Sequence, residues 1–191
     1  MHTEKSVAQD TVSAGIAVRP RNAEGVGAGG VYTVVCRDAN GNLKWSDSFH
    51  NLVVNQGLQD MNSKYFSGSG YTAAWYLGLV TGPGSGNTYA AGDTLASHAG
   101  WTENTNYAGN RKAATFGTAT TADPSVINNS GSPAVFTMNA NAQTIAGAFL
   151  CSVSSGTSGV LFSVGNFVGG NKTVDSGDTL TVTYEFSLDA V

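Results

Sequence analysis

The chain has 191 residues and a mass of 19.5 kDa, a size that suits one domain with its own hydrophobic core. Charged residues make up only 12% of it, against about 25% in typical soluble proteins, so Ser, Thr, Asn and Gly must supply much of the polar surface. The net charge is −4 without a basic cluster, which argues against binding to nucleic acid. No apolar run is long enough to span a membrane, so we expect neither nucleic acid nor a membrane among its partners.

The first 28 residues contain Pro20 and lead into a glycine-rich exit, EGVGAGG, and both are typical of an extended arm rather than of a core element. We therefore expect an N-terminal arm over residues 1–28 and a single β-sandwich domain over residues 29–191. The arm lacks the apolar segment of a secretory signal, so we expect the protein to fold in a reducing cytoplasm.

A hairpin and a helix are expected after the arm. The alternating runs VYTVVCRD and LKWSDSF flank an Asn-Gly pair, the strongest short signal for a β-hairpin. Leu58, Met61 and Tyr65 then recur at helical spacing, which predicts a short helix over residues 55–66. We expect Asn55 to cap this helix and the helix to cover one end of a sheet.

The rest of the chain reads as strands separated by clusters of Gly, Ser, Asn and Pro. A strongly apolar strand is predicted at 73–81, and further strands at 112–120, 133–139, 144–153, 159–168 and 179–188. The last of these alternates with period two, placing Leu180, Val182, Tyr184, Phe186 and Leu188 on one face. The pattern predicts an all-β fold, an antiparallel sandwich or jelly roll of about eight strands.

Two cysteines, Cys36 and Cys151, fall on rows that we expect to face inward, the second in a row with Phe149. Buried free thiols are the favoured interpretation, with a disulfide between the two sheets as the alternative. Neither interpretation implies a metal.

A segment of about thirty residues between Thr81 and Arg111 contains no convincing element. Loops of that length are usually functional or ordered by a neighbour, so we treat it as a candidate interaction loop. Its candidate residues are Asp93, His98, Trp101, Glu103, Tyr107 and Arg111. We expect Asp93 and Glu103 to accept backbone N–H bonds or to pair with Arg111, and Trp101 to anchor the loop on the sandwich. A metal site or an acid–base pair is the alternative, which the spacing does not favour.

Outside these candidate residues the sequence has no strong catalytic, phosphate-binding or metal-binding motif. There is no GxSxG elbow, and GPGSG at 82–86 lacks the GK[ST] of a phosphate loop. Asp175 and Asp178 could suggest calcium, but one such turn supplies too few oxygens, and a turn cap is favoured. We therefore predict no catalytic residue, cofactor or metal, and no enzyme activity. Carbohydrate recognition is kept as an alternative, with Trp101 and Tyr107 as the stacking surface.

Four stretches stand out by their length and specificity: GVYTVVCRDANGNLKWSDSFHNLVVNQGLQDM, YTAAWYLGLV, AAGDTLASHAGWTENTNY and VDSGDTLTVTYEFSL. Together they resemble a family of small proteins that tailed bacteriophages encode, and GDTLASHAGWTE is the most specific part. The resemblance covers most of residues 30–190 and leaves the arm outside. Members are mostly virion structural or uncharacterised phage proteins, so the resemblance implies a virion component, assembled in the bacterial cytoplasm, without a position on the particle.

The composition suits such a role. A neutral Ser/Thr/Asn surface and an extended arm favour a capsid decoration, cement or head-fibre/head–tail accessory subunit that contacts major capsid, portal or tail proteins. We expect a homo-oligomer, with a trimer favoured, in which arms lie over neighbours and weak contacts repeat by symmetry. The alternative function is a receptor- or carbohydrate-binding module of a phage tail or fibre.

Overall fold

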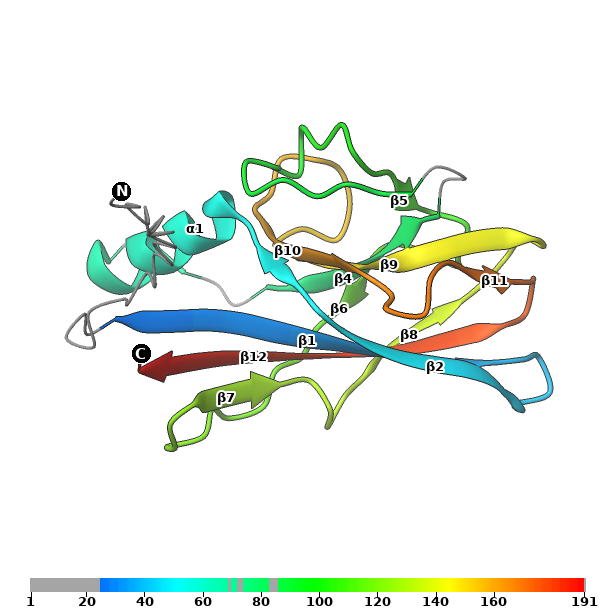
Figure 1. Ribbon diagram of the computed structural model, residues 1–191, viewed down its shortest axis with the longest axis horizontal. Helices are drawn as coiled ribbons and strands as arrows, with labels where there is room; N and C mark the ends of the chain where they lie inside the picture. The colour runs from blue at the N-terminus through cyan, green and yellow to red at the C-terminus, as the bar shows by residue number, and fades with distance from the viewer. Residues whose placement is uncertain (1–24, 69, 72–73, 83–85, 191) are drawn as a thin grey trace, which may run out of the picture.

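The structure is a computed structural model that describes residues 25–68, 70–71, 74–82 and 86–190. In these residues two antiparallel β-sheets form a sandwich, and one helix lies at an end of the molecule (Figure 1). This confirms the expected all-β antiparallel sandwich with one short helix. Residues 1–24 of the expected arm lie outside the described residues. The first strand begins at Val26, so residues 26–28 belong to the sheet and not to the arm.

The first sheet has five strands in the order β2–β1–β12–β7, with β8 also paired to β12. Their bounds are β1 Val26–Arg37, β2 Leu43–His50, β7 Ser125–Asn128, β8 Ala134–Thr137 and β12 Thr179–Ala190. β1 and β12 pair along their whole length, from Val26 opposite Ala190 to Arg37 opposite Thr179. The last strand therefore lies inside the sheet, with β1 on one side and β7 and β8 on the other.

The second sheet has seven strands in the order β3–β10–β9–β4–β5, with β11 also paired to β9 and β6 to β4. Their bounds are β3 Leu52–Val53, β4 Tyr76–Thr81, β5 Glu103–Asn104, β6 Lys112–Ala113, β9 Gln143–Cys151, β10 Leu161–Asn166 and β11 Lys172–Val174. The described residues thus contain twelve strands where about eight were expected. The unexpected β3, β5, β7 and β11 have two to four residues each, too few for an alternating pattern to be visible.

The Asn-Gly hairpin between β1 and β2 forms as predicted. Gly41 has a φ of 86°, a backbone conformation that glycine adopts without steric cost. The Asp38 carboxylate accepts the N–H groups of Asn40 at 2.9 Å and Asn42 at 2.8 Å, which closes the turn from the inside. Hydrogen bonds from Asn42, side chain first, lower the pKa of Asp38.

The apolar row of β12 faces the second sheet along the first half of the strand. Leu180, Val182 and Tyr184 are fully buried in the core cluster between the two sheets. Burial then decreases along the strand, because Phe186 is only partly buried and Leu188 is 36% exposed. The predicted alternation is confirmed, but its last two apolar residues extend beyond the covered part of the core.

Strand β9 is buried on both faces, which corrects the expected orientation of Phe149 and Cys151. Ile145, Ala148 and Leu150 lie in the core cluster between the sheets. Phe149 and Cys151 lie instead in a second cluster, on the other face of the sheet. Because the β9 sequence has no polar side chain from Ile145 to Cys151, alternation could not show which of its two rows faces the partner sheet.

Both cysteines are buried and free, as predicted, and the alternative of a disulfide between them is wrong. Cys36 lies in the core cluster between the sheets and Cys151 in the second cluster, so the two thiols lie in separate clusters. Burial raises the pKa of Cys36 to about 11, so this thiol is protonated at neutral pH.

Helix α1 spans Asn55–Phe66, the predicted bounds, but the expected capping role of Asn55 is wrong. The N-cap is Val54, and no side chain caps the helix. Gly57 is buried, and a Cβ there would lie 2.6 Å from the carbonyl oxygen of Phe162. Glycine therefore lets the helix approach β10 closely. In the part of the chain that the structure describes, no helix has the length and apolar character needed to cross a membrane.

Candidate functional site

The long loop between β4 and β6 lies over the second sheet (Figure 1). Within its described part, Leu95 and Trp101 are buried in the second cluster against Val80, Phe149 and Cys151. Burial of these apolar side chains stabilises the conformation of the loop against the sheet. The described part of the loop therefore covers this face of the sheet, and this burial explains how that part holds its conformation although β5, the strand within it, has two residues.

Asp93, His98 and Trp101 form one group within the loop. The Trp101 Nε1–H group donates to Asp93 Oδ2 at 3.1 Å, and the same oxygen accepts the N–H of Ala90 at 3.1 Å. The His98 ring stacks on the Trp101 indole with ring centroids 3.9 Å apart. These contacts confirm two predictions, that Asp93 accepts a backbone bond and that Trp101 anchors the loop.

Glu103 and Arg111 form a second group with Tyr107. Arg111 donates through Nε to Glu103 Oε1 at 2.8 Å and through Nη2 to Oε2 at 2.7 Å. Its Nη1 donates to the carbonyl oxygens of Val153 at 3.2 Å and Gly156 at 3.0 Å. Burial alone would lower the pKa of Arg111, but the hydrogen bonds and charge of Glu103 outweigh burial and the pKa is raised. The predicted Glu103–Arg111 pair is confirmed.

The burial of these groups bears on the alternatives considered from the sequence. Trp101 and Tyr107 are each only 4% exposed, so neither ring offers a face to a sugar, and the alternative of a carbohydrate-stacking surface at these two residues is wrong. Asp93 and Glu103 are both engaged in the bonds described above. Among the described residues, no three His, Cys, Asp or Glu side chains gather in a way that could hold a metal ion. These four side chains are therefore committed to contacts inside the subunit.

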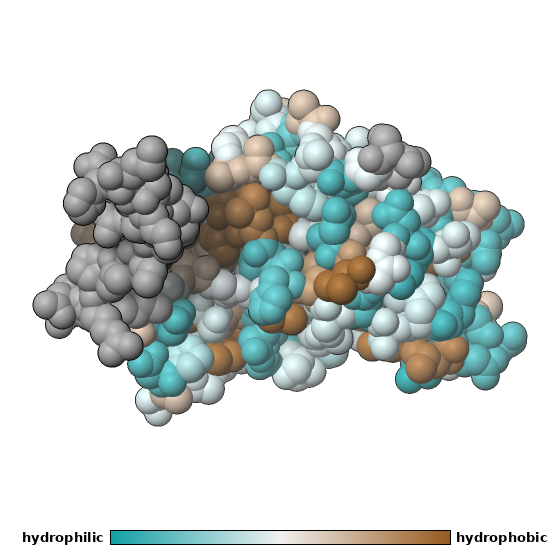
Figure 2. Space-filling view, in the orientation of Figure 1, coloured by the Kyte–Doolittle hydropathy of each residue, from teal (hydrophilic) through white to brown (hydrophobic). Residues whose placement is uncertain are grey.

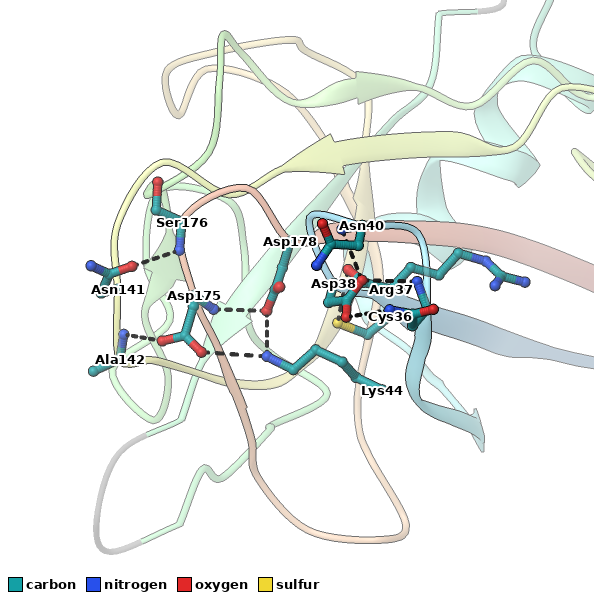
Figure 3. Close-up of polar contacts among 11 residues, drawn as sticks. Cys36, Arg37, Asp38, Asn40, Lys44, Asn141, Ala142, Asp175, Ser176 and Asp178 are labelled. Atoms are coloured by element: carbon teal, nitrogen blue, oxygen red, sulfur yellow. Dashed lines mark hydrogen bonds and ion pairs between the residues drawn. The ribbon is translucent and has the colours of Figure 1, made fainter.

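The turn before β12 holds the two carboxylates that suggested calcium. Asp178 Oδ2 accepts the N–H of Asp175 at 2.8 Å and the Lys44 ammonium at 2.6 Å. Asp175 accepts the N–H of Ala142 at 3.0 Å, and its other oxygen lies 3.4 Å from the Lys44 ammonium (Figure 3). The backbone N–H of Ala142, with Lys44 second, lowers the pKa of Asp175. A lysine already pairs with both acids, and the turn-cap interpretation is confirmed.

An apolar groove of about 910 Å³ lies between helix α1 and the ends of β1, β7 and β12. Its floor is the end of the core cluster, where four side chains are only partly covered: Met61, Trp75, Phe116 and Phe186. Its rim carries Val26, Tyr65 and Phe66, which are 74%, 83% and 79% exposed. On the face that Figure 2 draws, apolar residues also gather in a hollow toward the α1 end of the molecule. Exposed apolar surface of this extent usually marks an interaction site.

Polar groups in the groove are few, and two of them bind each other. Trp75 Nε1–H donates to the Tyr71 hydroxyl at 3.0 Å, and the Lys64 ammonium donates to the carbonyl oxygen of Gly70 at 3.0 Å. These bonds join the segment after α1 to the helix and to the groove wall. Asp60 is the one carboxylate among the lining residues. A groove of this composition suits an apolar partner better than a charged one.

Two sequence patterns point to the groove, although we interpreted both as signs of core packing. The stripe of Leu58, Met61 and Tyr65 predicted a helix face against the sheet, but only Met61 packs on the core cluster. Tyr65 is exposed, and Leu58 lies at the surface as well. The row of β12 likewise continues to Leu188, which no element of the described residues covers fully. Apolar residues that extend past the end of a core are the signal that could have located this site.

Comparisons with known proteins give no matching family model, no matching curated protein and no matching solved structure. The function is therefore inferred from the features described above. Of the loop, the charged turn and the groove, the groove is the feature that combines large exposed apolar side chains with a concave shape.

Proposed function

We propose that this protein is a structural subunit of a bacteriophage virion, a capsid decoration, cement or head-fibre/head–tail accessory protein. It works by contacts with neighbouring proteins and not by a reaction. The observation that carries the contact part of the proposal is the apolar groove beside α1. The four stretches that resemble small proteins of tailed bacteriophages support the virion part of the proposal.

The groove explains how such a subunit holds its neighbours. Full burial of one exposed Val, Leu or Phe side chain contributes about 1.5–3 kcal/mol. A partner that covers Val26, Phe66 and the exposed part of Leu188 therefore gains a few kcal/mol in total at each groove. Repetition of that modest gain over symmetry-related copies gives strong attachment of the whole assembly. A homo-oligomer, with a trimer favoured, presents the groove once per subunit on each particle.

The composition of the groove sets its response to salt. Its lining contains a single acid, Asp60, and a single lysine, Lys64, whose ammonium already binds a backbone carbonyl. Screening by salt acts on charges and leaves apolar burial largely unchanged. Attachment through the groove should therefore persist when the salt concentration is raised, in contrast to attachment through surface ion pairs.

Purified virions of a phage that encodes this chain provide the test. Quantitative mass spectrometry should find the protein at a fixed copy number per particle that is compatible with the symmetry of the capsid or of the head–tail junction. A wash in high salt should not reduce that number. Particles that contain none of the protein would overturn the proposal, and full release by salt would remove the groove as the contact surface.

A further inference from the structure

The first sheet has one face in the core and one face outside it. In β1, Tyr32 and Val34 are fully buried between the sheets, so the alternate residues of this strand lie on the outer face. β12 alternates in the same way, and its outer row lies beside that of β1 because the two strands pair along their whole length. The middle of the outer face comprises Ser46, Ser48, Thr33, Val35, Thr181 and Thr183. None of these six residues belongs to either apolar cluster.

The side chains in the middle of this face are short and uncharged, and their hydroxyl groups have partners within the sheet. The Thr33 and Ser48 hydroxyls lie 2.8 Å apart and share a hydrogen bond. Thr183 Oγ1 donates to the carbonyl oxygen of Thr33 at 3.5 Å. Hydroxyl groups that already have hydrogen bonds cost little when they are covered. A second sheet can therefore pack on this face with a small loss of hydration energy.

The face carries opposite charges toward its two ends. Arg37 is exposed at one end of the β1 row, and Glu185, which pairs with Val31, is exposed toward the other. Six residues of β1 separate the two positions, a distance of about 20 Å. Arg37 Nη1 donates to the carbonyl oxygen of Gly41 at 3.0 Å. Because a guanidinium has five N–H donors, this bond leaves Arg37 able to bind a carboxylate.

A hollow of about 310 Å³ lies beside Glu185 on the same face. Its lining includes Val31 and Thr33 on β1, Asn128 at the end of β7, and Ser130. Asn128 Nδ2 donates to Glu185 Oε2 at 3.4 Å. The hollow thus offers a carboxylate together with hydroxyl and amide oxygens. These acceptors suit a cationic side chain with several donors, and a guanidinium is the group that binds a carboxylate through two parallel bonds.

We propose that two copies of this chain pair face to face through this outer face, with Arg37 of each copy seated in the hollow beside the partner's Glu185. A two-fold axis lets both copies use the same surface. An axis across the strands reverses their direction, so the Arg37 end of one copy lies over the Glu185 end of the other. An axis along the strands would instead bring the two Arg37 ends together. Since like charges repel, the charges favour the axis across the strands.

The size of the face suits such a pair. β1 and β12 have 12 residues each, and the order β2–β1–β12–β7 makes the sheet four strands wide. At about 3.4 Å per residue and about 4.8 Å per strand, the face measures at most about 40 by 19 Å, or about 760 Å². A standard protein interface buries about 800 Å² on each partner. The outer face can therefore hold two copies together without a contribution from the groove.

This contact goes beyond the proposed function, because it uses a different surface. Val26 and Phe186, which line the groove, belong to the opposite rows of β1 and β12 from those that form the outer face. A paired subunit thus keeps its groove available for other proteins. Where three-fold symmetry is also present, a two-fold contact joins the copies into assemblies with an even number of subunits.

An exchange of the two charges tests the pairing in the full chain. Arg37→Glu and Glu185→Arg each create two pairs of like charges in the dimer. Each variant should therefore raise the dissociation constant at least about a hundredfold, about tenfold for each pair. The double variant Arg37→Glu/Glu185→Arg restores opposite charges and should associate within about tenfold of the unmodified chain. Sedimentation equilibrium measures the dissociation constants, and circular dichroism melts confirm that each variant is folded.

A second set of variants tests which surface is used. Thr181→Arg puts a long charged side chain in the middle of the face and should also raise the dissociation constant at least about a hundredfold. Its control is Thr173→Arg, which adds the same charge at an exposed position on β11 of the second sheet and should leave association unchanged. Phe66→Ser changes the groove rim and should leave association unchanged as well.

The contrary outcomes are distinct. A full chain that stays monomeric at high concentration, or that forms only an odd-numbered oligomer, would overturn the pairing. Single charge variants that dissociate, with no recovery in the double variant, would overturn the placement of Arg37 over the partner's Glu185. Loss of association in Phe66→Ser would assign the contact to the groove. The copy number of the protein in virions is measured independently, so the two proposals can fail separately.

Discussion

Replacing Glu103 with glutamine tests whether the long loop is held by its buried ion pair. The side chains of Arg111 and Glu103 are 5% and 20% exposed, and two short hydrogen bonds join them. Glutamine keeps the size and one acceptor oxygen but removes the negative charge and points an amide donor at the guanidinium. Arg111 then stays buried with neutral carbonyl partners only.

The size of the effect follows from this geometry. Breaking a buried pair costs about 3–5 kcal/mol, and the partial exposure of Glu103 reduces this to about 2–3 kcal/mol. In a chain of this length each kcal/mol lowers the melting temperature by about 2–4 °C, so Glu103→Gln should melt about 5–10 °C lower. Calorimetry or a thermal melt followed by circular dichroism measures this directly.

A double-mutant cycle supplies the control. With Arg111→Met in the background, Glu103→Gln should cost less than about 1 kcal/mol, because no buried charge is left unpaired. Equal costs in both backgrounds would refute the reasoning. Below its melting temperature the Glu103→Gln protein should attach to particles normally, since the pair serves the fold. Loss of attachment by the folded variant would instead assign the loop an interaction role.

Three further predictions concern the groove, the thiols and the charged turn. Phe66→Ser should reduce attachment to particles at least about tenfold, since about 1.4 kcal/mol of lost apolar burial has that effect, whereas Leu43→Ser, at an exposed site on β2, should not. A thiol reagent at pH 8 should label neither Cys36 nor Cys151 in the folded protein and both after denaturation; labelling of the native state would contradict their burial. The pKa of Asp175 is lowered, so its contribution to stability is complete above about pH 4 and is lost as the pH falls through the folded pKa. In Asp175→Asn the free energy of unfolding should therefore fall less steeply as the pH is lowered below about 4. An unchanged dependence of the free energy of unfolding on acidic pH would contradict this.

Several elements of the fold could be predicted from the sequence because their signals are local. The Asn-Gly pair formed the expected hairpin, since Gly41 adopts a positive φ and Asp38 closes the turn within five residues. The helix began and ended at the expected residues, and the alternation of β12 placed Leu180 to Tyr184 in the core. The pairing of Glu103 with Arg111 was also expected, because the two opposite charges share one loop.

What only the tertiary structure decided is which apolar surface is covered and by what. β9 is apolar on both faces, so its own residues could not show that Phe149 and Cys151 face the long loop and not the partner sheet. In the same way, Tyr65 and Leu188 follow the spacing of buried residues but lie where no described element reaches them. A periodic pattern shows which side chains share a face, and that is a property of a few neighbouring residues. Whether the face meets a core or solvent depends on strands that are distant in the chain, so the groove became visible only in the folded molecule.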